Sequence, residues 1–309
     1  MKCLVTGATG FVGRELCKQL SLAGHEVLAY SRTGEGLENG TPTRAVDFRN
    51  ATLDAQQLAG VELVFHLAGI AHQQAAAEDY ESVNHVAALN LARQAEAAGV
   101  RCFVFLSSVK AMGEGSAGAI ARSESDCVRP VDHYGLSKWM AETALNDEFC
   151  RRTMAVCVLR PALVYGTDAK GNLASLAKAV SLGLPRPPEA GGRSMIAVED
   201  LCALMLHIPW QCEAGVRTYI VSDGEQYSLR RIYDVMRRVQ GLGPGRAWCP
   251  RWLWRVACSL LDWLRPRNAP RWETLFGYEL YSNEQLLRAT SWRPQRSLEN
   301  TLPPPAGHP

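Results

Sequence analysis

The stretch Gly7-Ala8-Thr9-Gly10-Phe11-Val12-Gly13 lies near the N-terminus and decides the predicted fold. Apolar residues at 3–6 predict a buried strand before it, and periodic apolar residues at 12–23 predict a helix after it, ending near Gly24. Glycines three residues apart permit a tight turn, a close approach to a pyrophosphate and close packing of the helix on the strand. Because a helix N-terminus presents free N–H groups to phosphate, the stretch predicts a dinucleotide-binding loop. A glycine-rich turn alone is a weak signal, so the rest of the chain must support it.

The composition is that of an ordinary globular protein, with 47% hydrophobic and 21% charged residues in a chain of 309. The net charge of +2 and the absence of a clustered basic stripe give no reason to expect a nucleic-acid partner. Ten cysteines include no CxxC pair or zinc-ligand spacing, so we expect no metal site. Thiols such as Cys3, Cys102 and Cys157 fall in predicted strands, which indicates a reducing, cytoplasmic location. Met1-Lys2 leads directly into the first strand, so no signal peptide is expected.

Predicted strands alternate with predicted helices through the first half of the chain. Further strands are expected near 26–30, 44–46, 61–68, 102–106 and 155–159, and helices over 53–59, 84–98 and 134–152. The strands are apolar on both faces, which is typical of a parallel sheet covered on both sides. We therefore expect an α/β fold, a doubly wound parallel-sheet Rossmann domain with a smaller α+β C-terminal domain. The first is placed over 1–165 with returns near 195–222, and 166–309 is placed mainly in the substrate-binding domain.

Tyr134 and Lys138 lie four residues apart on a predicted helix and therefore share one face. A nearby cation lowers the pKa of a tyrosine, so the phenol or phenolate would serve as general acid or base near neutral pH. Such a pair occurs by chance on many helices. Ser107 and Ser108 strengthen the prediction, because they end a strand at the sheet edge where open α/β folds bind ligands. The alternative for these serines is a strand-end cap.

These features together resemble the extended short-chain dehydrogenase/reductase family, the NAD-dependent epimerase/dehydratase group, over most of the chain. The resemblance continues through Asp47, His66-Leu67-Ala68-Gly69, Asn84 and the segments 159–166 and 193–201. It implies that Tyr134 is the catalytic acid/base, that Lys138 holds the nicotinamide ribose and tunes Tyr134, and that Ser108 orients the substrate oxygen. It also implies a homodimer.

The resemblance further implies a set of ligand contacts. Those implied for the dinucleotide are Gly7, Thr9, Gly10, Phe11, Val12, Gly13, Ser31, Arg32, Asp47, Phe48, Leu67, Ala68, Gly69, Asn84, Ser107, Tyr134, Lys138, Pro161 and Leu163. Those implied for a nucleotide-sugar substrate are Ser108, Lys110, Asn172 and Arg193. A guanidinium fork such as that of Arg193 suits a diphosphate, and the alternative is a surface arginine.

Two departures from the family pattern bear on the cofactor and the reaction. NAD-binding members usually end the second strand with an Asp on the ribose hydroxyls, whereas this chain has Ser31 and Arg32. A hydroxyl and a guanidinium suit a 2′-phosphate, which favours NADP(H). The alternative is NAD(H), with Arg32 stacked on the adenine. Sugar-nucleotide 4,6-dehydratases carry an Asp-Glu pair where this chain has Val109 and Lys110, which excludes dehydration by that route.

The segments 108–114, 169–176 and 193–194 look like a bacterial branch that acts on UDP-linked N-acetylhexosamines for surface polysaccharide such as lipopolysaccharide O-antigen. The resemblance therefore implies NADPH-dependent 4-ketoreduction of a UDP-4-keto-6-deoxy-HexNAc, with a proton from Tyr134. One alternative is a UDP-GlcNAc or UDP-glucose 4-epimerase with tightly bound NAD. Another is a non-catalytic NADP(H)-binding sensor, although such proteins typically lose the Tyr or the Lys that this chain keeps.

A tryptophan-rich segment at 251–267 is bracketed by Arg251, Arg265 and Arg267. No apolar run in the chain reaches the ~18 residues that a membrane-spanning helix needs. The segment therefore predicts a helix packed into the C-terminal domain, or one that associates weakly with a membrane surface or contacts a second subunit.

Overall fold

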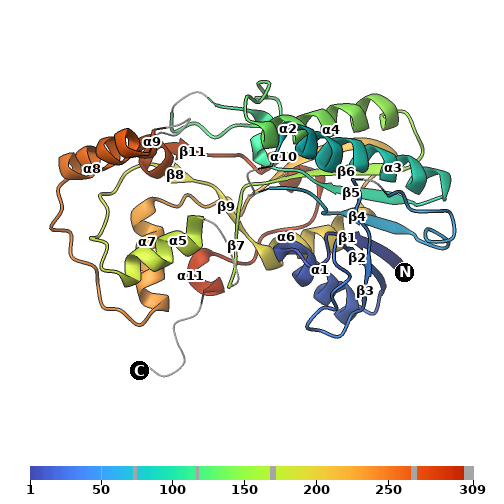
Figure 1. The fold of residues 1–309 in the computed structure, drawn as a ribbon, viewed down its shortest axis with the longest axis horizontal. Helices are drawn as coiled ribbons and strands as arrows, with labels where there is room; N and C mark the ends of the chain where they lie inside the picture. The colour runs from blue at the N-terminus through green and yellow to red at the C-terminus, as the bar shows by residue number, and fades with distance from the viewer. Residues whose placement is uncertain (50, 72–74, 116–117, 168–171, 266–269, 303–309) are drawn as a thin grey trace.

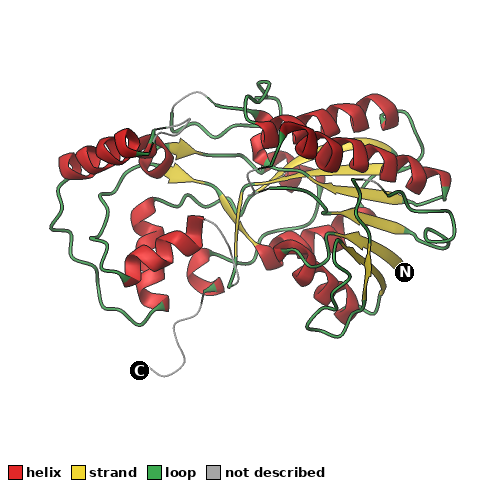
Figure 2. Ribbon diagram, in the orientation of Figure 1, coloured by secondary structure: helices red, strands yellow, loops and turns green. Residues whose placement is uncertain are grey.

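The computed structural model describes residues 1–49, 51–71, 75–115, 118–167, 172–265 and 270–302. A layered part with a central sheet lies beside a smaller, mainly helical part (Figures 1 and 2). The strands are β1 Lys2–Thr6, β2 Glu26–Ser31, β3 Thr43–Ala45, β4 Leu63–His66, β5 Cys102–Leu106, β6 Ala155–Pro161, β7 Leu163–Tyr165, β8 Gly192–Arg193, β9 Met195–Ala197, β10 Gly215–Val221 and β11 Tyr278–Glu279. The α-helices are α1 Phe11–Leu22, α2 Ala77–Tyr80, α3 Ala87–Ala97, α4 His133–Phe149, α5 Asn172–Ser181, α6 Val198–His207, α7 Leu229–Val239, α8 Arg251–Leu264, α9 Arg271–Phe276, α10 Glu284–Ala289 and α11 Leu298–Thr301. The π-helix η1 spans Glu81–Val86, and the 3₁₀-helices are η2 Val109–Met112 and η3 Ile208–Trp210.

The central sheet has seven strands in the order β10-β6-β5-β4-β1-β2-β3, and every neighbouring pair is parallel. The strand order reverses at β1, so a crevice opens at the carboxyl end of β1 between the chains that leave β1 and β4. Register pairs Thr6 with both Tyr30 and His66, which brings the ends of three strands to one edge. The predicted α/β fold class is confirmed.

Helices cover both faces of the sheet, as its two-sided apolar strands require. On one face, α1 and α6 bury side chains such as Leu16, Leu20 and Leu201 against the sheet. On the other face, α3 and α4 bury Leu91 and Leu145 among others. Figure 1 shows these two layers on opposite sides of the strands. Helix α4 therefore lies across the sheet with its first turn at the ligand-binding edge.

The smaller part is built from α5, α7, α8, α9 and α11, with the two-stranded pairs β8–β11 and β7–β9 leading into it (Figure 2). Tyr165, Tyr227 and Tyr233 are fully buried in its core. No helix of the described residues is both long and apolar enough to span a bilayer.

Two helix predictions differ from the structure. Residues 55–60 form turns instead of the helix expected over 53–59. The Asp54 and Gln57 side chains each accept the other residue's backbone N–H at 2.8 Å, as at a helix start, but the Ala59 and Val61 N–H groups then donate three residues back and Gly60 turns the chain with a φ of 71°. The helix expected over 84–98 begins earlier, at Ala77, and its continuation through η1 is π-helical. Asn84 lies in this wider turn, where π-bulges often accompany functional sites.

Candidate active site

The glycine loop occupies the turn between β1 and α1. Gly7 has a φ of 68°, and the Gly10 N–H donates to the Gly7 carbonyl at 2.9 Å. A Cβ on Gly13 would lie only 2.2 Å from the Gly7 carbonyl oxygen, so α1 can approach the loop this closely only through a glycine. Gly10 caps α1 without a side chain, which leaves the first-turn N–H groups directed at the crevice. The loop therefore fits a pyrophosphate.

Replacing Gly13 by Ala is expected to destabilise the protein by about 1–3 kcal/mol and to weaken dinucleotide binding, because the added methyl group pushes α1 off the loop. Urea unfolding and titration with NADPH measure the two effects. Gly243→Ala is the matched control, since a Cβ there meets nothing within 4 Å. Equal stabilities of the two variants would contradict the packing argument.

Beneath the loop, Thr6 joins the ends of β1 and β4. Its Oγ1 accepts the N–H groups of Leu67 at 3.2 Å and Ala68 at 3.1 Å and is hydrogen-bonded to His66 Nδ1 at 2.9 Å. Full burial lowers the pKa of His66 to about 3, so the ring is neutral. This network fixes the backbone of Leu67 and Ala68 at the wall of the crevice.

Ser108, Tyr134 and Lys138 meet at the carboxyl edge of the sheet. Ser108 follows β5 and caps η2, where its Oγ accepts the Lys110 N–H at 3.2 Å. Tyr134 lies in the first turn of α4, whose N-cap is Asp132, and Lys138 follows one turn later. The Lys138 ammonium donates to the Leu106 carbonyl at 2.8 Å and is 4% exposed. The structure thus brings the three predicted catalytic residues together.

The protonation of this group differs from the expectation. Burial raises the pKa of Tyr134 to about 12, although a hydrogen bond with Ser108 opposes the rise. Burial also lowers the pKa of Lys138 to about 8, against the stabilising charge of Glu142. The prediction of a lowered Tyr134 pKa is therefore wrong for the protein chain by itself, because burial outweighs the hydrogen bond with Ser108. Tyr134 holds its proton at neutral pH.

Sequence reasoning missed a buried ion pair behind these residues. Glu142 on α4 accepts from Arg160 Nε at 3.0 Å and Nη2 at 2.6 Å, and both side chains are nearly inaccessible. The Ser107 hydroxyl donates to the same carboxylate. Ser107 thereby acts as a positioning residue, since its hydroxyl faces Glu142. The spacing of Glu142, one turn beyond Lys138 and two beyond Tyr134, was the signal available for it.

The side-chain amide of Asn84 also forms hydrogen bonds within the chain. Its amide accepts the Ile70 N–H at 2.8 Å and donates to the Ile70 carbonyl and the Ser137 hydroxyl, both at 3.0 Å. It therefore ties the loop after β4 to α4. A Cβ on Gly69 would lie 2.8 Å from this amide and 3.3 Å from the Lys138 ammonium. Asn84 and Gly69 thus shape the wall beside Lys138.

Ser31 and Arg32 at the end of β2 were both predicted to contact the cofactor, but only Arg32 is exposed. Thr43 Oγ1 donates to the Glu35 carbonyl, so Ser31 Oγ donates to Thr43 at 3.1 Å and accepts the Gly34 N–H at 2.9 Å. Ser31 is 3% exposed, which does not support its direct contact with a phosphate. Arg32 is exposed and forms no ion pair with the described residues.

Asp47 follows β3 and is paired with Arg49 at 2.5 Å, and this partner lowers the pKa of the carboxyl group. Phe48 lies edge-on to the His66 ring, with centroids 6.1 Å apart. The residues at the ends of β1, β2, β3 and β4 therefore fit a dinucleotide: a glycine cradle for the pyrophosphate, an apolar and aromatic wall, and an exposed guanidinium.

The predicted substrate contacts lie where the smaller part meets the sheet. Arg193 in β8 is partly buried and donates to the Thr274 carbonyl at 2.7 Å. Its register partner in β11 is Glu279, which forms an ion pair with Lys110 at 3.4 Å. Glu279 thus neighbours Arg193 along the backbone and Lys110 through its side chain. Asn172 begins α5, but its side chain and residues 168–171 lie outside the described part.

Two further predicted cofactor residues, Pro161 and Leu163, lie where β6 ends and β7 begins. Pro161 ends β6 and is buried, and Leu163 begins β7 with a partly exposed side chain. Ser107 and Ser108 follow β5, which pairs in parallel with β6, so Pro161 lies at the same edge of the sheet as the two serines. Both residues therefore lie near the carboxyl edge of the sheet, where the dinucleotide contacts are predicted.

Comparison with known proteins assigns the family. The sequence model of the NAD dependent epimerase/dehydratase family matches residues 3–222. The chain belongs to this family. A UDP-glucose 4-epimerase from Vibrio cholerae is 34% identical over 259 residues, which cover 80% of this chain and 79% of that protein. An N-acetyl-alpha-D-glucosaminyl-diphospho-ditrans,octacis-undecaprenol 4-epimerase from Escherichia coli O157:H7 is 25% identical over 234 residues, covering 74% and 69%. A solved UDP-glucuronic acid 4-epimerase from Bacillus cereus in complex with NAD has a TM-score of 0.76 and 18% identity, covering 98% and 96%, which shows the shared fold.

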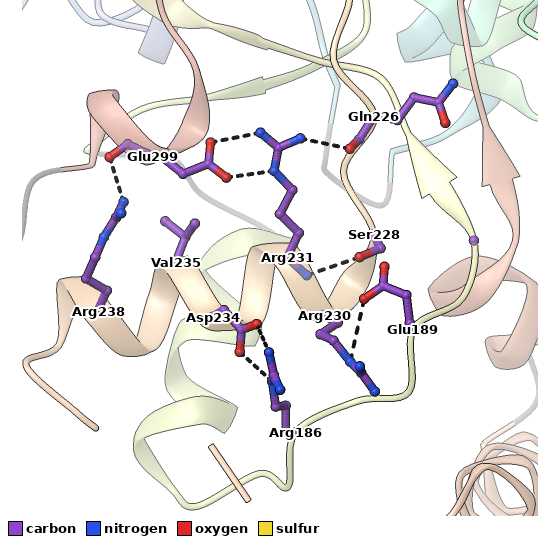
Figure 3. Close-up of a pocket in the computed structure, with 11 residues that line it drawn as sticks. Arg186, Glu189, Gln226, Ser228, Arg230, Arg231, Asp234, Val235, Arg238 and Glu299 are labelled. Carbon is purple, nitrogen blue, oxygen red and sulfur yellow. Dashed lines mark hydrogen bonds and ion pairs between the residues drawn. The ribbon is translucent and has the colours of Figure 1, made fainter. Parts of the chain in front are cut away.

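This member of the epimerase/dehydratase family also has a hollow of about 700 Å³ along α7 (Figure 3). Three of its four arginines are paired with acids: Arg186 pairs with Asp234 at 2.5 Å, Arg230 with Glu189 at 3.6 Å, and Arg231 with Glu299 at 2.6 Å. The fourth, Arg238, donates to the Glu299 backbone carbonyl at 2.6 Å. The hollow is lined by none of the predicted catalytic residues. We interpret it as a charge-compensated surface depression, and the crevice at the sheet edge remains the candidate active site.

Proposed function

We propose that the protein is an oxidoreductase acting at C4 of a UDP-linked hexose, and specifically that it reduces a UDP-4-keto-6-deoxy-N-acetylhexosamine. The observation that carries the proposal is the meeting of Ser108, Tyr134 and Lys138 at the carboxyl edge of the sheet. A bound NADPH supplies the hydride. Ser108 hydrogen-bonds the C4 oxygen, and Tyr134 donates its proton to that oxygen as negative charge develops there.

A protonated Tyr134 suits the proton transfer that reduction requires. A ketone that accepts hydride at C4 needs a proton on oxygen, and a phenol with a pKa of about 12 carries that proton at neutral pH. The Lys138 ammonium, which donates to the Leu106 carbonyl, adds positive charge close to the developing negative charge on the C4 oxygen. An oxidation at C4 would instead need the phenolate.

A diphosphate-linked sugar agrees with the cations near the site. The Vibrio cholerae relative is named for UDP-glucose and the Escherichia coli relative for a sugar on undecaprenyl diphosphate, and both substrates join a sugar to a diphosphate. Arg193 and Lys110 are the side chains we assign to that diphosphate, since Glu279 is the register partner of Arg193 and the ion-pair partner of Lys110. Arg193 lies in the proposed substrate-binding part, formed mainly by residues 166–309, and Lys110 lies in η2 of the sheet part.

The second candidate is a 4-epimerase with tightly held NAD, and the names of the relatives favour it. In that reaction NAD would take the hydride from C4 and return it to the opposite face, while Tyr134, helped by Ser108 and Lys138, would take the proton of the C4 hydroxyl and give it back. Incubation of the pure protein with UDP-GlcNAc and no added cofactor separates the two candidates. Formation of UDP-GalNAc would overturn the reductase, whereas NADPH consumption that requires a 4-keto sugar supports it.

The cofactor proposal rests on Arg32, since Ser31 is committed within the chain. We expect Arg32→Ala to raise the KM for NADPH by about 10-fold or more and to leave that for NADH nearly unchanged, because the guanidinium is assigned to the 2′-phosphate. Initial rates with both cofactors measure this. Arg44→Ala, at an exposed arginine of β3, is the control. An equal change in both KM values would indicate stacking on the adenine.

A further inference from the structure

Helix α8 lies at the outer end of the smaller part (Figure 1). One of its faces is buried through Trp254 and Cys258, which pack with Leu229 and Phe276. The opposite face carries large exposed apolar side chains at helical spacing: Trp252, Val256, Leu260, Trp263 and Leu264. The helix therefore buries one side in its own domain and presents a second apolar side outward.

This exposed face is too apolar to be an ordinary solvated surface. Trp252 is 64% exposed and Trp263 77% exposed, and Trp248 in the preceding loop is exposed as well. Single exposed apolar residues are common, but a contiguous patch of this kind marks an interaction site. Tryptophan is also the residue that prefers the boundary between lipid and water, because its ring is apolar and its N–H is polar.

The charges around the face indicate what covers it. Arg251, Arg255 and Arg265 form no ion pair among the described residues, and the first two lie over the Trp272 ring beside α8. The one acidic residue of α8, Asp262, is paired with Arg271 at 2.5 Å. The apolar face is thus bordered by unneutralised positive charge. Residues 266–269, which include Arg267, lie outside the described part.

We propose that the exposed face of α8 docks the protein on the surface of a lipid bilayer that contains anionic headgroups. The apolar side chains enter the boundary between headgroups and acyl chains, and the arginines contact the anionic headgroups. A second copy of the chain is a poorer partner, because a two-fold contact between these faces would bring the same unpaired arginines together. Docking does not depend on which reaction the active site performs.

Docking would hold the substrate-binding part against the membrane. Helix α9 packs on α8 through Trp254 and Phe276, whose ring centroids are 5.8 Å apart. The Thr274 carbonyl of α9 accepts a hydrogen bond from Arg193. The docking helix and the proposed diphosphate contact are therefore joined by one short helix.

Co-sedimentation of the full chain with vesicles tests the proposal, using phosphatidylcholine alone and phosphatidylcholine mixed with phosphatidylglycerol. We expect binding to the mixed vesicles, at least ~10-fold weaker binding without the anionic lipid, and partial release by salt. The double variant Trp252→Glu/Trp263→Glu should lose at least ~10-fold in partitioning. Both side chains are exposed, so the variant should melt at the wild-type temperature.

Trp210→Glu is the matched control, since Trp210 is 61% exposed but lies in η3, remote from α8 in sequence and packed near Arg101. It should bind vesicles as the wild type does. Wild-type protein that stays in the supernatant with both vesicle types would overturn the proposal, and so would undiminished binding by a folded double variant. A wild-type dimer that the double variant abolishes, without vesicle binding, would assign the face to a second copy and also overturn it.

Discussion

Replacing Tyr134 by Phe is expected to lower kcat for reduction of a UDP-4-keto sugar by about 10³-fold, because the variant lacks the proton donor for the C4 oxygen. The ring keeps its packing beside Tyr80, at a centroid distance of 6.3 Å, so the fold and NADPH binding should be preserved. Single-turnover rates and an NADPH titration measure the two quantities separately. Wild-type reduction should slow as the pH rises through about 8, where Lys138 loses its charge, although Tyr134, with a pKa of about 12, stays protonated there.

Tyr30→Phe is the control for loss of a buried phenol. The Tyr30 hydroxyl is buried without a hydrogen-bond partner among the described residues, and its ring packs in the sheet core. Its removal should leave kcat nearly unchanged. A Tyr134→Phe variant that reduces the ketone at the wild-type rate would contradict the proton-donor role and leave a binding module as the better interpretation.

Replacing Glu142 by Ala should lower the free energy of unfolding by about 3–5 kcal/mol, because it leaves the Arg160 guanidinium buried without a counter-charge. The Ser107 hydroxyl loses its acceptor in the same step. Urea denaturation followed by circular dichroism measures the change. A double variant, Glu142→Met with Arg160→Met, should recover much of the loss, since it removes both buried charges.

Glu148→Ala is the matched control on the same helix. Glu148 forms a bidentate ion pair with Arg93 at 2.7 Å, but the arginine side chain is about half exposed, so water screens the charges. The expected cost is about 0–1 kcal/mol. If the two alanine variants were equally stable, burial would not set the strength of these ion pairs.

The fold was largely predictable because its determinants are local. Buried strands, helix periodicity and the three glycines each act within a few residues, and Gly7, Gly10 and Gly13 lie as the loop prediction requires. The helix predicted over 53–59 was wrong, although the signal for its start was also local. The Asp54 and Gln57 side chains form the reciprocal hydrogen bonds of a helix start, but the Ala59 N–H donates only three residues back and Gly60, with a φ of 71°, ends the turn.

The sequence allowed the residues of the candidate site to be predicted, but not their protonation or their hydrogen-bond partners. Ser108, Tyr134 and Lys138 were named from spacing and strand-end position, and they do meet. The pKa of Tyr134 was predicted in the wrong direction, because burial depends on segments far apart in sequence. The partners of Ser31 and Asn84 were likewise invisible, since Thr43 and Ser137 become neighbours only through sheet register and helix packing.

Strand β10 has a consequence for how the chain is synthesised. It pairs with β6 from Gly215–Ala155 to Val221–Pro161, and the chain between the two strands carries β7, α5, β8, β9 and α6. While a ribosome is still translating that intervening stretch, the emerged sheet ends at β6 with an open row of backbone donors and acceptors. Such an edge is a template for association with other chains, and its closure needs a contact distant in sequence, which forms slowly. The nascent sheet is therefore completed only after residue 221 has left the exit tunnel.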